Sequence, residues 1–310
     1  MNLPQDFVTT IQNAFGEDGR AWLAALPDLI DAASRQWGLT NVQPVSNLSY
    51  NYVAFALRSP GILPGRVNQS TLGRSVVLKI GVPNHELTSE INALRSFDGK
   101  GAVRLLEADE KRAMFLLERL RPGEMLATLT DDDRATQIAA DVMLNLWCPP
   151  PTKGAFIKLS DWFKGLEKLR RRFRGGTGPF EKSLIERAEH SVANFFNESY
   201  VPMLIHGDLH HYNILSSDHG WLVIDPKGVI GPAAYEVGPL LMNPLGFLNQ
   251  FDAIQITKRR ISILAERLGF ERERIREWGI AHAVLSAWWD LEDNMDWGYA
   301  MHCAEVIAQA

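Results

Sequence analysis

The sequence predicts an α+β protein of two lobes, with a mixed β-sheet in the first lobe and mostly helices in the second. Short apolar segments rich in β-branched and aromatic residues dominate between residues 42 and 120, whereas helical periodicity dominates after residue 131. Arg121-Pro-Gly123 interrupts both patterns. Because 310 residues exceed a typical single domain, we expect one lobe over 1–120 and another over 121–310.

The composition is that of a globular protein with a small negative charge. Hydrophobic residues make up 46% and charged residues 22% of the chain, and the net charge is −5. This charge excludes a basic nucleic-acid-binding surface and suits a cationic substrate. Cys148 and Cys303 form no CxxC motif, so neither a disulfide framework nor structural zinc is expected. Since no signal peptide and no membrane-spanning run is found, a cytoplasmic protein without membrane contact is expected.

The first lobe is expected to place an N-terminal helical layer against its sheet. Apolar residues recur at helical spacing over 5–37, and alternation predicts two strands within 42–57. The remaining elements, in chain order, are a turn-rich connection at 60–65, a strand at 75–80, a helix at about 86–97, and antiparallel strands within 103–106 and 113–120.

One lysine in the apolar strand Ser75–Ile80 is the first candidate for binding a ligand. A buried strand seldom carries Lys79 unless its ammonium group reaches water or an anion. The following helix offers Glu90 as a partner, with Glu86 as the competitor. In protein kinases such a pair orients the lysine toward the α- and β-phosphates of ATP. A lysine whose head reaches solvent, beside a solvated glutamate, is the alternative.

Two further segments of the first lobe are candidates for nucleotide binding. The loop containing Ser46 and Asn47 lies where a kinase has a glycine-rich hairpin; it has no glycine, but its side chains could donate hydrogen bonds to phosphate. An ordinary polar turn explains it equally well. The backbone from Glu118 to Leu120 is expected to hydrogen-bond the edge of adenine.

The second lobe is expected to be built from amphipathic helices around one polar motif. The helices fall near 131–148, 180–199, 251–268, 272–292 and 296–308. The motif is His206-x-Asp208-x-x-x-x-Asn213, followed by a strand that ends at Asp225. This is the spacing of a kinase catalytic loop, in which the first Asp accepts the hydroxyl proton while Asn and the later Asp hold Mg²⁺. We expect one β-turn-β unit to bring the three side chains together.

The same residues have two other interpretations. His206, Asp208, His210 and His211 could form a zinc cluster of a hydrolase, since His and Asp are ordinary zinc ligands. Buried His and Asp could also do no more than hydrogen-bond a turn. The kinase interpretation is favoured because it also explains Asn213 and the later aspartate.

Four residues are candidates for substrate contact: Glu236, Trp288, Asp290 and Asp293. Paired tryptophans and several carboxylates between 285 and 296 would suit an ammonium or guanidinium group. The alternative is a helix end whose Trp288 packs in the core while the acidic side chains face water.

Four segments resemble the aminoglycoside/hydroxyurea antibiotic-resistance kinases, and among these the streptomycin 6-phosphotransferases. They are the motif from His206 to Asn213, Gly220-Trp-Leu-Val-Ile-Asp-Pro226, Gly101–Leu106 and the region around Leu285–Trp288. The resemblance runs from about Val42 to the C-terminus. It implies a protein-kinase-like fold that binds ATP between its lobes.

On the same resemblance, Asp208 is the base, Asn213 and Asp225 bind Mg²⁺, and Lys79 with Glu90 positions the phosphates. His206 and His210 support the loop by hydrogen bonds, and Asp225-Pro226-Lys227 stands where protein kinases have Asp-Phe-Gly.

The function expected from these observations is transfer of the γ-phosphate of ATP to a hydroxyl of a cationic aminoglycoside such as streptomycin. A kinase for an endogenous small alcohol or amino sugar is the alternative within the same chemistry. A nucleotide-binding protein without catalysis is a third hypothesis. The presence of Lys79, Asp208, Asn213 and Asp225 together argues against it.

Overall fold

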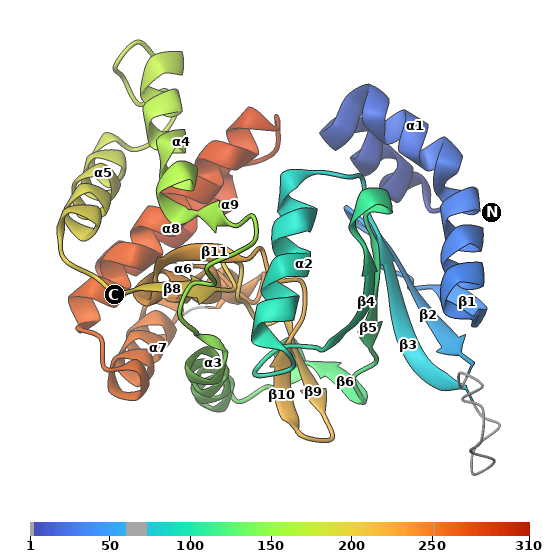
Figure 1. The fold of residues 1–310 in the computed structure, drawn as a ribbon. Helices are drawn as coiled ribbons and strands as arrows, with labels where there is room; N and C mark the ends of the chain where they lie inside the picture. The colour runs from blue at the N-terminus through green and yellow to red at the C-terminus, as the bar shows by residue number, and fades with distance from the viewer. Residues whose placement is uncertain (1–2, 60–72, 251) are drawn as a thin grey trace. The chain divides into compact units, whose positions relative to one another are not determined.

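The computed structural model describes residues 3–59, 73–250 and 252–310. The chain divides into two compact units (Figure 1): residues 1–99 with 103–120 form unit 1, and residues 100–102 with 121–310 form unit 2. The connection predicted at 60–65 lies outside the described residues. The α+β class, with a sheet in the first unit and mostly helices in the second, is confirmed.

The described part of unit 1 contains a five-stranded sheet of order β1-β2-β3-β5-β4. All its neighbouring strands pair antiparallel, so the prediction of a mixed sheet is wrong. The reason is that β5 inserts between β3 and β4 and runs opposite to both. The strands are β1 (Leu39–Pro44), β2 (Tyr52–Arg58), β3 (Arg74–Ile80), β4 (Leu105–Asp109) and β5 (Met114–Glu118).

Helices α1 (Gln5–Trp37) and α2 (His85–Phe97) lie on opposite faces of this sheet (Figure 1). The backbone of α1 is not helical at Gly16, and its buried apolar side chains pack against alternate residues of β2 and β3. Asn84 caps α2 by accepting a hydrogen bond from the backbone N–H of Leu87. The sheet residues that α1 leaves uncovered therefore share a face with α2.

Unit 2 is mostly helical, as predicted. Its α-helices are α3 (Asp132–Leu146), α4 (Leu159–Arg172), α5 (Lys182–Asn197), α6 (Val237–Leu241), α7 (Ala253–Leu268), α8 (Arg272–Glu292) and α9 (Gly298–Gln309). Asp131 caps α3 through the N–H of Arg134. Helix α8 is central because it packs against α5, α6 and α9. Short 3₁₀ helices occur at Glu110–Arg112 in unit 1 and at Leu126–Thr128, Ala233–Glu236 and Phe247–Asn249 in unit 2.

Two small sheets of unit 2 carry the polar motif. One has the order β10-β9-β6 and the other β7-β11-β8. The strands are β6 (Pro122–Met125), β7 (Ile157–Lys158), β8 (Pro202–Ile205), β9 (Ile214–Ser217), β10 (Gly220–Val223) and β11 (Val229–Pro232). The first strand of the motif and the hairpin that follows it thus belong to different sheets.

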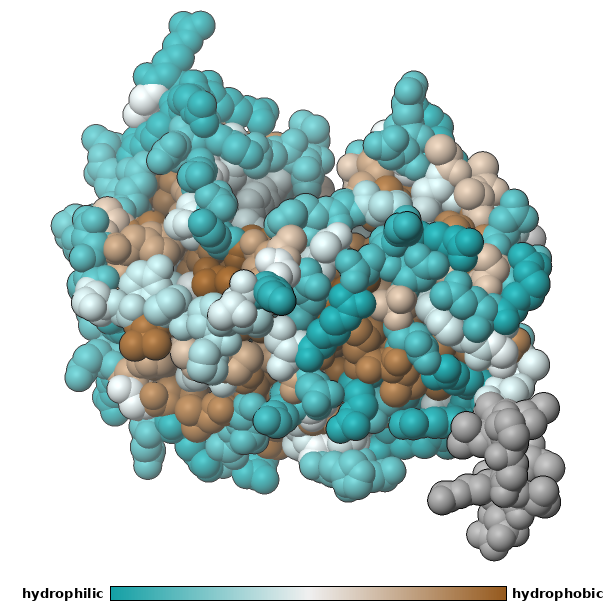
Figure 2. Space-filling model, viewed as in Figure 1, coloured by the Kyte–Doolittle hydropathy of each residue, from teal (hydrophilic) through white to brown (hydrophobic). Residues whose placement is uncertain are grey.

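Hydrophilic residues are spread over the face of the molecule seen in Figure 2, with hydrophobic residues showing as smaller patches between them. Within the described ranges, no helix is long and apolar enough to cross a membrane.

Candidate active site

A glycine between His206 and Asp208 sets the course of the loop that leaves β8. Gly207 has φ +89°, a conformation that favours glycine. A Cβ atom at this position would lie 2.4 Å from Cγ2 of Val229 and 3.1 Å from the ring of Trp162. Only glycine therefore allows the backbone to approach β11 this closely. This close contact fixes the position of the backbone at the next residue, Asp208.

The imidazole of His206 joins this loop to the segment that carries Asp225. Its Nε2 lies 2.8 Å from the carbonyl oxygen of Ile224, and its Nδ1 accepts the N–H of Asp208 at 3.2 Å. Burial lowers the pKa of His206 to about 4, so the ring is neutral and Nε2 is the nitrogen that donates. The carbonyl of His206 also accepts the N–H of Lys227 at 2.8 Å.

Glu236 binds the same loop through two backbone N–H groups. Its carboxylate is fully buried and accepts the backbone N–H of His206 at 2.6 Å and that of Gly207 at 2.8 Å. Burial raises the pKa of Glu236 to about 7, although both N–H bonds favour the charged form. The prediction that Glu236 contacts substrate is therefore corrected: its carboxylate is engaged inside the protein, where it positions the residues next to Asp208.

Asn213 and Asp225 lie beside Asp208 because of two further hydrogen bonds. The side-chain amide of Asn213 donates to the carbonyl of Asp208 at 3.0 Å. Its backbone carbonyl accepts the N–H of Ile224 at 2.9 Å, and Asp225 follows directly with φ +57°. The hairpin of β9 and β10 thus brings Asn213 and Asp225 together, as predicted, whereas Asp208 joins them from the loop that leaves β8, outside this β-turn-β unit.

The oxygen atoms of this cluster suit a hard divalent cation. Because the amide nitrogen of Asn213 is used within the loop, its Oδ1 is the atom left for a ligand. The carboxylate of Asp225 would supply a second oxygen, and Mg²⁺ prefers such ligands. The Asp208 side chain is 38% exposed, which leaves it accessible to a substrate hydroxyl. These three side chains can hold a cation and accept a proton.

The side chains proposed as zinc ligands are not arranged around a common site. Both ring nitrogens of His206 are bonded to backbone groups, and Nδ1 of His210 accepts the N–H of Tyr212 at 3.3 Å. His210 Nε2 lies 3.6 Å from Oδ1 of Asp208. In the part of the chain that the structure describes, no group of three or more His, Cys, Asp or Glu residues is arranged to hold a metal ion. His206 and His210 support the loop, as predicted.

The lysine–glutamate pair of unit 1 is formed by the partner favoured from the sequence. Lys79 Nζ lies 2.7 Å and 2.9 Å from the two carboxylate oxygens of Glu90, and both side chains are buried. Glu86 is exposed on the first turn of α2. The ammonium of Lys79 also lies 5.7 Å from the ring centroid of Phe115. A buried lysine bonded through both carboxylate oxygens is held in one orientation, as a phosphate-binding group requires.

The other predicted nucleotide contacts lie at the ends of strands in unit 1. Ser46 and Asn47 are exposed in the loop between β1 and β2. The N–H of Glu118 donates to the carbonyl of Arg104 at 3.0 Å, so this donor is taken within the sheet. A contact of adenine with this segment therefore depends on its other backbone groups, up to Leu120.

The prediction that Trp288 contacts substrate is wrong, and the alternative of a core position is the one the structure shows. Trp288 is 2% exposed and packs against Gly165 of α4, where an added Cβ would lie 2.9 Å from the indole. It belongs to the core. Trp289 is half-buried instead and meets Trp162 of α4 edge to face, with ring centroids 5.4 Å apart. The sequence offered no sign of Trp162, which lies about 45 residues from the motif and reaches it only through the packing of α4 against β11.

The acidic side chains beside Trp289 lie at the end of α8. Asp290 is half-buried, and burial together with Asp293 and Asp296 raises its pKa to about 6. Asp293 and Asp296 are exposed. His282, earlier on the same helix, forms a hydrogen bond with Tyr235: its Nδ1 lies 2.8 Å from the tyrosine hydroxyl. Burial lowers the pKa of His282 to about 4, so it is neutral.

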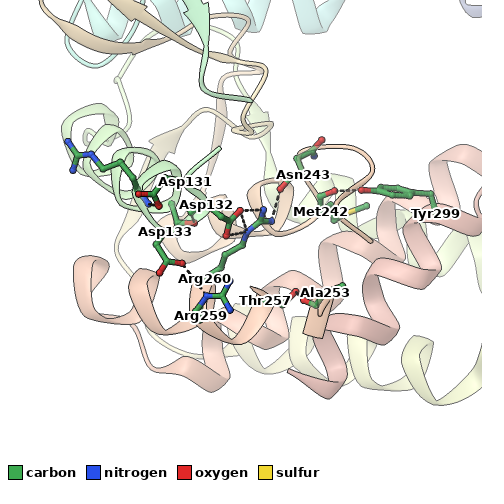
Figure 3. Close-up of polar contacts among 12 residues, drawn as sticks. Asp131, Asp132, Asp133, Met242, Asn243, Ala253, Thr257, Arg259, Arg260 and Tyr299 are labelled. Atoms are coloured by element: carbon green, nitrogen blue, oxygen red, sulfur yellow. Dashed lines mark hydrogen bonds and ion pairs between the residues drawn. The ribbon is translucent and has the colours of Figure 1, made fainter. Parts of the chain in front are cut away.

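A buried arginine joins α7 to α3 and to the segment that begins at Asn243 (Figure 3). Arg260 of α7 is 1% exposed and binds both oxygens of Asp132 as well as the carbonyl of Asn243. The loop that begins at Asn243 reaches the motif, since the N–H of Leu245 donates to the hydroxyl of Tyr212 at 3.1 Å. The arginine thus fixes a segment that contacts the catalytic loop directly.

The fold and these residues define a phosphotransferase of the kinase-like class that uses an alcohol group as acceptor. Residues 54–294 match the aminoglycoside/hydroxyurea antibiotic resistance kinase family, and the chain belongs to this family. The resemblance predicted from the motifs is confirmed.

Two relatives align with most of this chain. The chain is 31% identical over 297 residues to a streptomycin 6-kinase of Streptomyces glaucescens, covering 95% of this chain and 92% of the relative. It is 27% identical to a hydroxyurea phosphotransferase of Kitasatospora aureofaciens, covering 95% of this chain and 82% of the relative.

Solved structures share the fold. A thermostable mutant of aminoglycoside phosphotransferase APH(4)-Ia, in a ternary complex with ADP and hygromycin B, matches with a TM-score of 0.61 and 14% identity, covering 90% of this chain and 98% of that one. The choline kinase LicA from Streptococcus pneumoniae matches with a TM-score of 0.60 and 14% identity, covering 91% and 97%. The protein-kinase-like fold is therefore confirmed.

Proposed function

We propose that this kinase transfers the γ-phosphoryl group of ATP to a hydroxyl of a cationic aminoglycoside such as streptomycin. The observation that carries the proposal is the loop in which His206, Gly207 and Glu236 fix the backbone next to Asp208. A base that is positioned by backbone bonds needs no rearrangement when the hydroxyl arrives.

Each residue of the site has a separate task in this proposal. Asp208 accepts the proton of the acceptor hydroxyl as the oxygen attacks phosphorus. Asn213 and Asp225 would hold Mg²⁺, which neutralises charge on the phosphates when it is bound. Lys79, oriented by Glu90, binds the α- and β-phosphates. Ser46, Asn47 and the backbone from Glu118 to Leu120 remain proposed contacts of the nucleotide.

A cationic acceptor is supported by the aromatic and acidic side chains of unit 2. Trp162 touches Gly207 and meets Trp289, so an indole surface adjoins the residue before Asp208. Asp290 and Asp293 would attract the guanidinium or ammonium groups of the substrate, and an indole adds cation–π attraction. Among cationic acceptors we favour streptomycin, because the relative that is 31% identical to this chain is a streptomycin 6-kinase.

The experiment is an acceptor panel measured by ADP release and by mass spectrometry of the product. Purified protein is incubated with ATP and Mg²⁺ and with streptomycin, hydroxyurea or choline in turn. The proposal expects a phosphorylated product with streptomycin and the highest kcat/KM for it. Turnover of hydroxyurea or choline alone would refute the acceptor and retain phosphoryl transfer. Absence of ADP release with every acceptor would contradict catalysis itself.

A further inference from the structure

An arginine at the end of β5 stacks on an exposed aromatic ring. Cζ of Arg119 lies 3.7 Å from the ring centroid of Phe55 on β2. Its Nη1 donates to Oγ of Ser75 on β3 at 3.3 Å. The guanidinium thus reaches across β3 to β2 and lies against a phenylalanine that is 37% exposed. Such a stack leaves the second face of the planar guanidinium uncovered by the ring.

This stack lies on the face of the sheet that carries Lys79. Phe55 pairs with Val77, and Val53 pairs with Lys79, in the antiparallel register of β2 and β3. Directly opposed residues and residues two apart share one face of a sheet. Phe55 therefore lies on the face of the buried Lys79–Glu90 pair, one two-residue repeat farther along the strands.

The opposite face has a different environment. Ala54, Ala56, Val76 and Leu78 are buried in the core shared with α1. In contrast, Phe55 and Leu57 are exposed, and Val77 is half-buried. An apolar surface therefore continues from Lys79 toward Arg119 without a helix packed on it at Phe55.

The charge of Arg119 is not balanced by an acidic side chain in the part of unit 1 that the structure describes. Its neighbour Glu118 accepts the backbone N–H of Arg104, and Glu107 pairs with Arg58 at 2.6 Å. Arg119 is half-buried and makes its contacts with an aromatic ring and a serine hydroxyl. A guanidinium in this setting is suited to stack with a second planar group.

We infer that the Arg119 guanidinium, seated on Phe55, is a stacking surface for the purine base of the nucleotide. The inference rests on the proposed function, in which Lys79 binds the phosphates of the same molecule. A two-residue step along β3 spans roughly 7 Å, which leaves room for the ribose between base and phosphates. Because every purine has a π-face, the stack adds affinity for ATP and GTP alike.

The test compares Arg119→Ala with Arg74→Ala, which removes the same charge from an exposed residue of β3. Arg74 is one residue from Ser75 and its side chain therefore points to the other face of the sheet. Calorimetry measures the Kd of the non-hydrolysable analogue AMP-PNP, and inorganic tripolyphosphate serves as a ligand without a base. Melting temperatures establish that each variant is folded.

Arg119→Ala is expected to raise the Kd of AMP-PNP about fivefold, because a stacked cation contributes on the order of 1 kcal/mol. The Kd of tripolyphosphate is expected to stay unchanged, and Arg74→Ala is expected to bind both ligands like the wild type. Arg119→Lys, which retains the charge but not the plane, should lose most of the same affinity.

Three results would overturn the inference. Arg119→Ala could bind AMP-PNP as tightly as the wild type, which would show that the base does not stack there. It could bind more tightly, in which case the side chain obstructs the base. It could lose affinity for tripolyphosphate equally, which would make Arg119 a phosphate ligand. In each case the wild type still binds AMP-PNP; a wild type that did not bind it would refute the nucleotide binding on which the proposed function rests, and a different acceptor in the panel would refute the proposed substrate without changing the binding of AMP-PNP.

Discussion

Replacing Glu236 by glutamine removes one hydrogen-bond acceptor from beneath the catalytic loop. The carboxylate accepts two N–H groups, from His206 at 2.6 Å and from Gly207 at 2.8 Å. A glutamine side chain has one oxygen and an NH₂ group, so it can accept only one of them and presents a donor to the other. The buried N–H that faces this donor loses its partner.

The size of the effect follows from that count. A hydrogen bond to a charged group contributes about 1.5–3 kcal/mol, and an unsatisfied buried N–H costs about 1–3 kcal/mol. Glutamine also removes a buried carboxylate whose pKa is raised to about 7, and this relief offsets part of the loss. We expect Glu236→Gln to lower the free energy of unfolding by about 2–3 kcal/mol, measured by urea denaturation.

The kinetic consequence is specific to the transfer step. Asp208 follows Gly207 directly, so a shift of the loop moves the base and should lower kcat at least tenfold. The KM for ATP should change less than twofold, because Lys79 and Glu90 belong to unit 1. The control is Glu305→Gln, an exposed residue of α9. The reasoning is refuted if Glu236→Gln retains the kcat of the wild type.

Three further predictions follow. Gly207→Ala places a methyl group 2.4 Å from Val229 in a backbone with φ +89°, so kcat should fall at least tenfold in the ADP-release assay; wild-type activity would contradict the close approach. Arg260→Met removes the hydrogen bonds to Asp132, whose side chain is 28% exposed, and to the carbonyl of Asn243, and should cost about 1.5–3 kcal/mol of unfolding free energy, against less than about 1 kcal/mol for the same change in an exposed arginine. His206 and His282, with pKa values of about 4, take up protons more readily when unfolded, so they lower stability as the pH falls from 6.5 toward 4. Glu236 and Asp290, whose pKa values are raised to about 7 and about 6, bind protons more readily in the folded state and oppose this loss, so the histidines are best followed directly: their NMR resonances in the folded protein should titrate near pH 4, and titration near pH 6.5 would show that they are not buried as neutral rings.

The sequence was sufficient for the elements whose pattern is local. Long amphipathic periods predicted α3, α5, α7 and α8, and alternation predicted the strands of unit 1. The order of those strands could not be read in the same way. Placing β5 between β3 and β4 depends on packing between distant residues, so the sheet was expected to be mixed but is antiparallel.

The site shows the same division between local and distant information. The spacing of the motif identified Asp208, Asn213 and Asp225, since a loop of fixed length places them. The neighbours of α8 determine which of the two adjacent tryptophans packs in the core. Gly165 of α4 has no side chain and leaves space there for the indole of Trp288. The role of Glu236 was missed because its partners are backbone N–H groups, which leave no trace in a pattern of side chains.

The central claim is that Asp208, held by its loop, takes the proton of the acceptor hydroxyl. Asp208→Asn keeps the shape of the side chain and removes the base, so the most direct measurement is the rate of transfer to streptomycin together with the Kd of AMP-PNP. The account predicts a fall in kcat of about a thousandfold or more with nucleotide affinity within twofold of the wild type. A variant that retains a tenth or more of the wild-type kcat would contradict it.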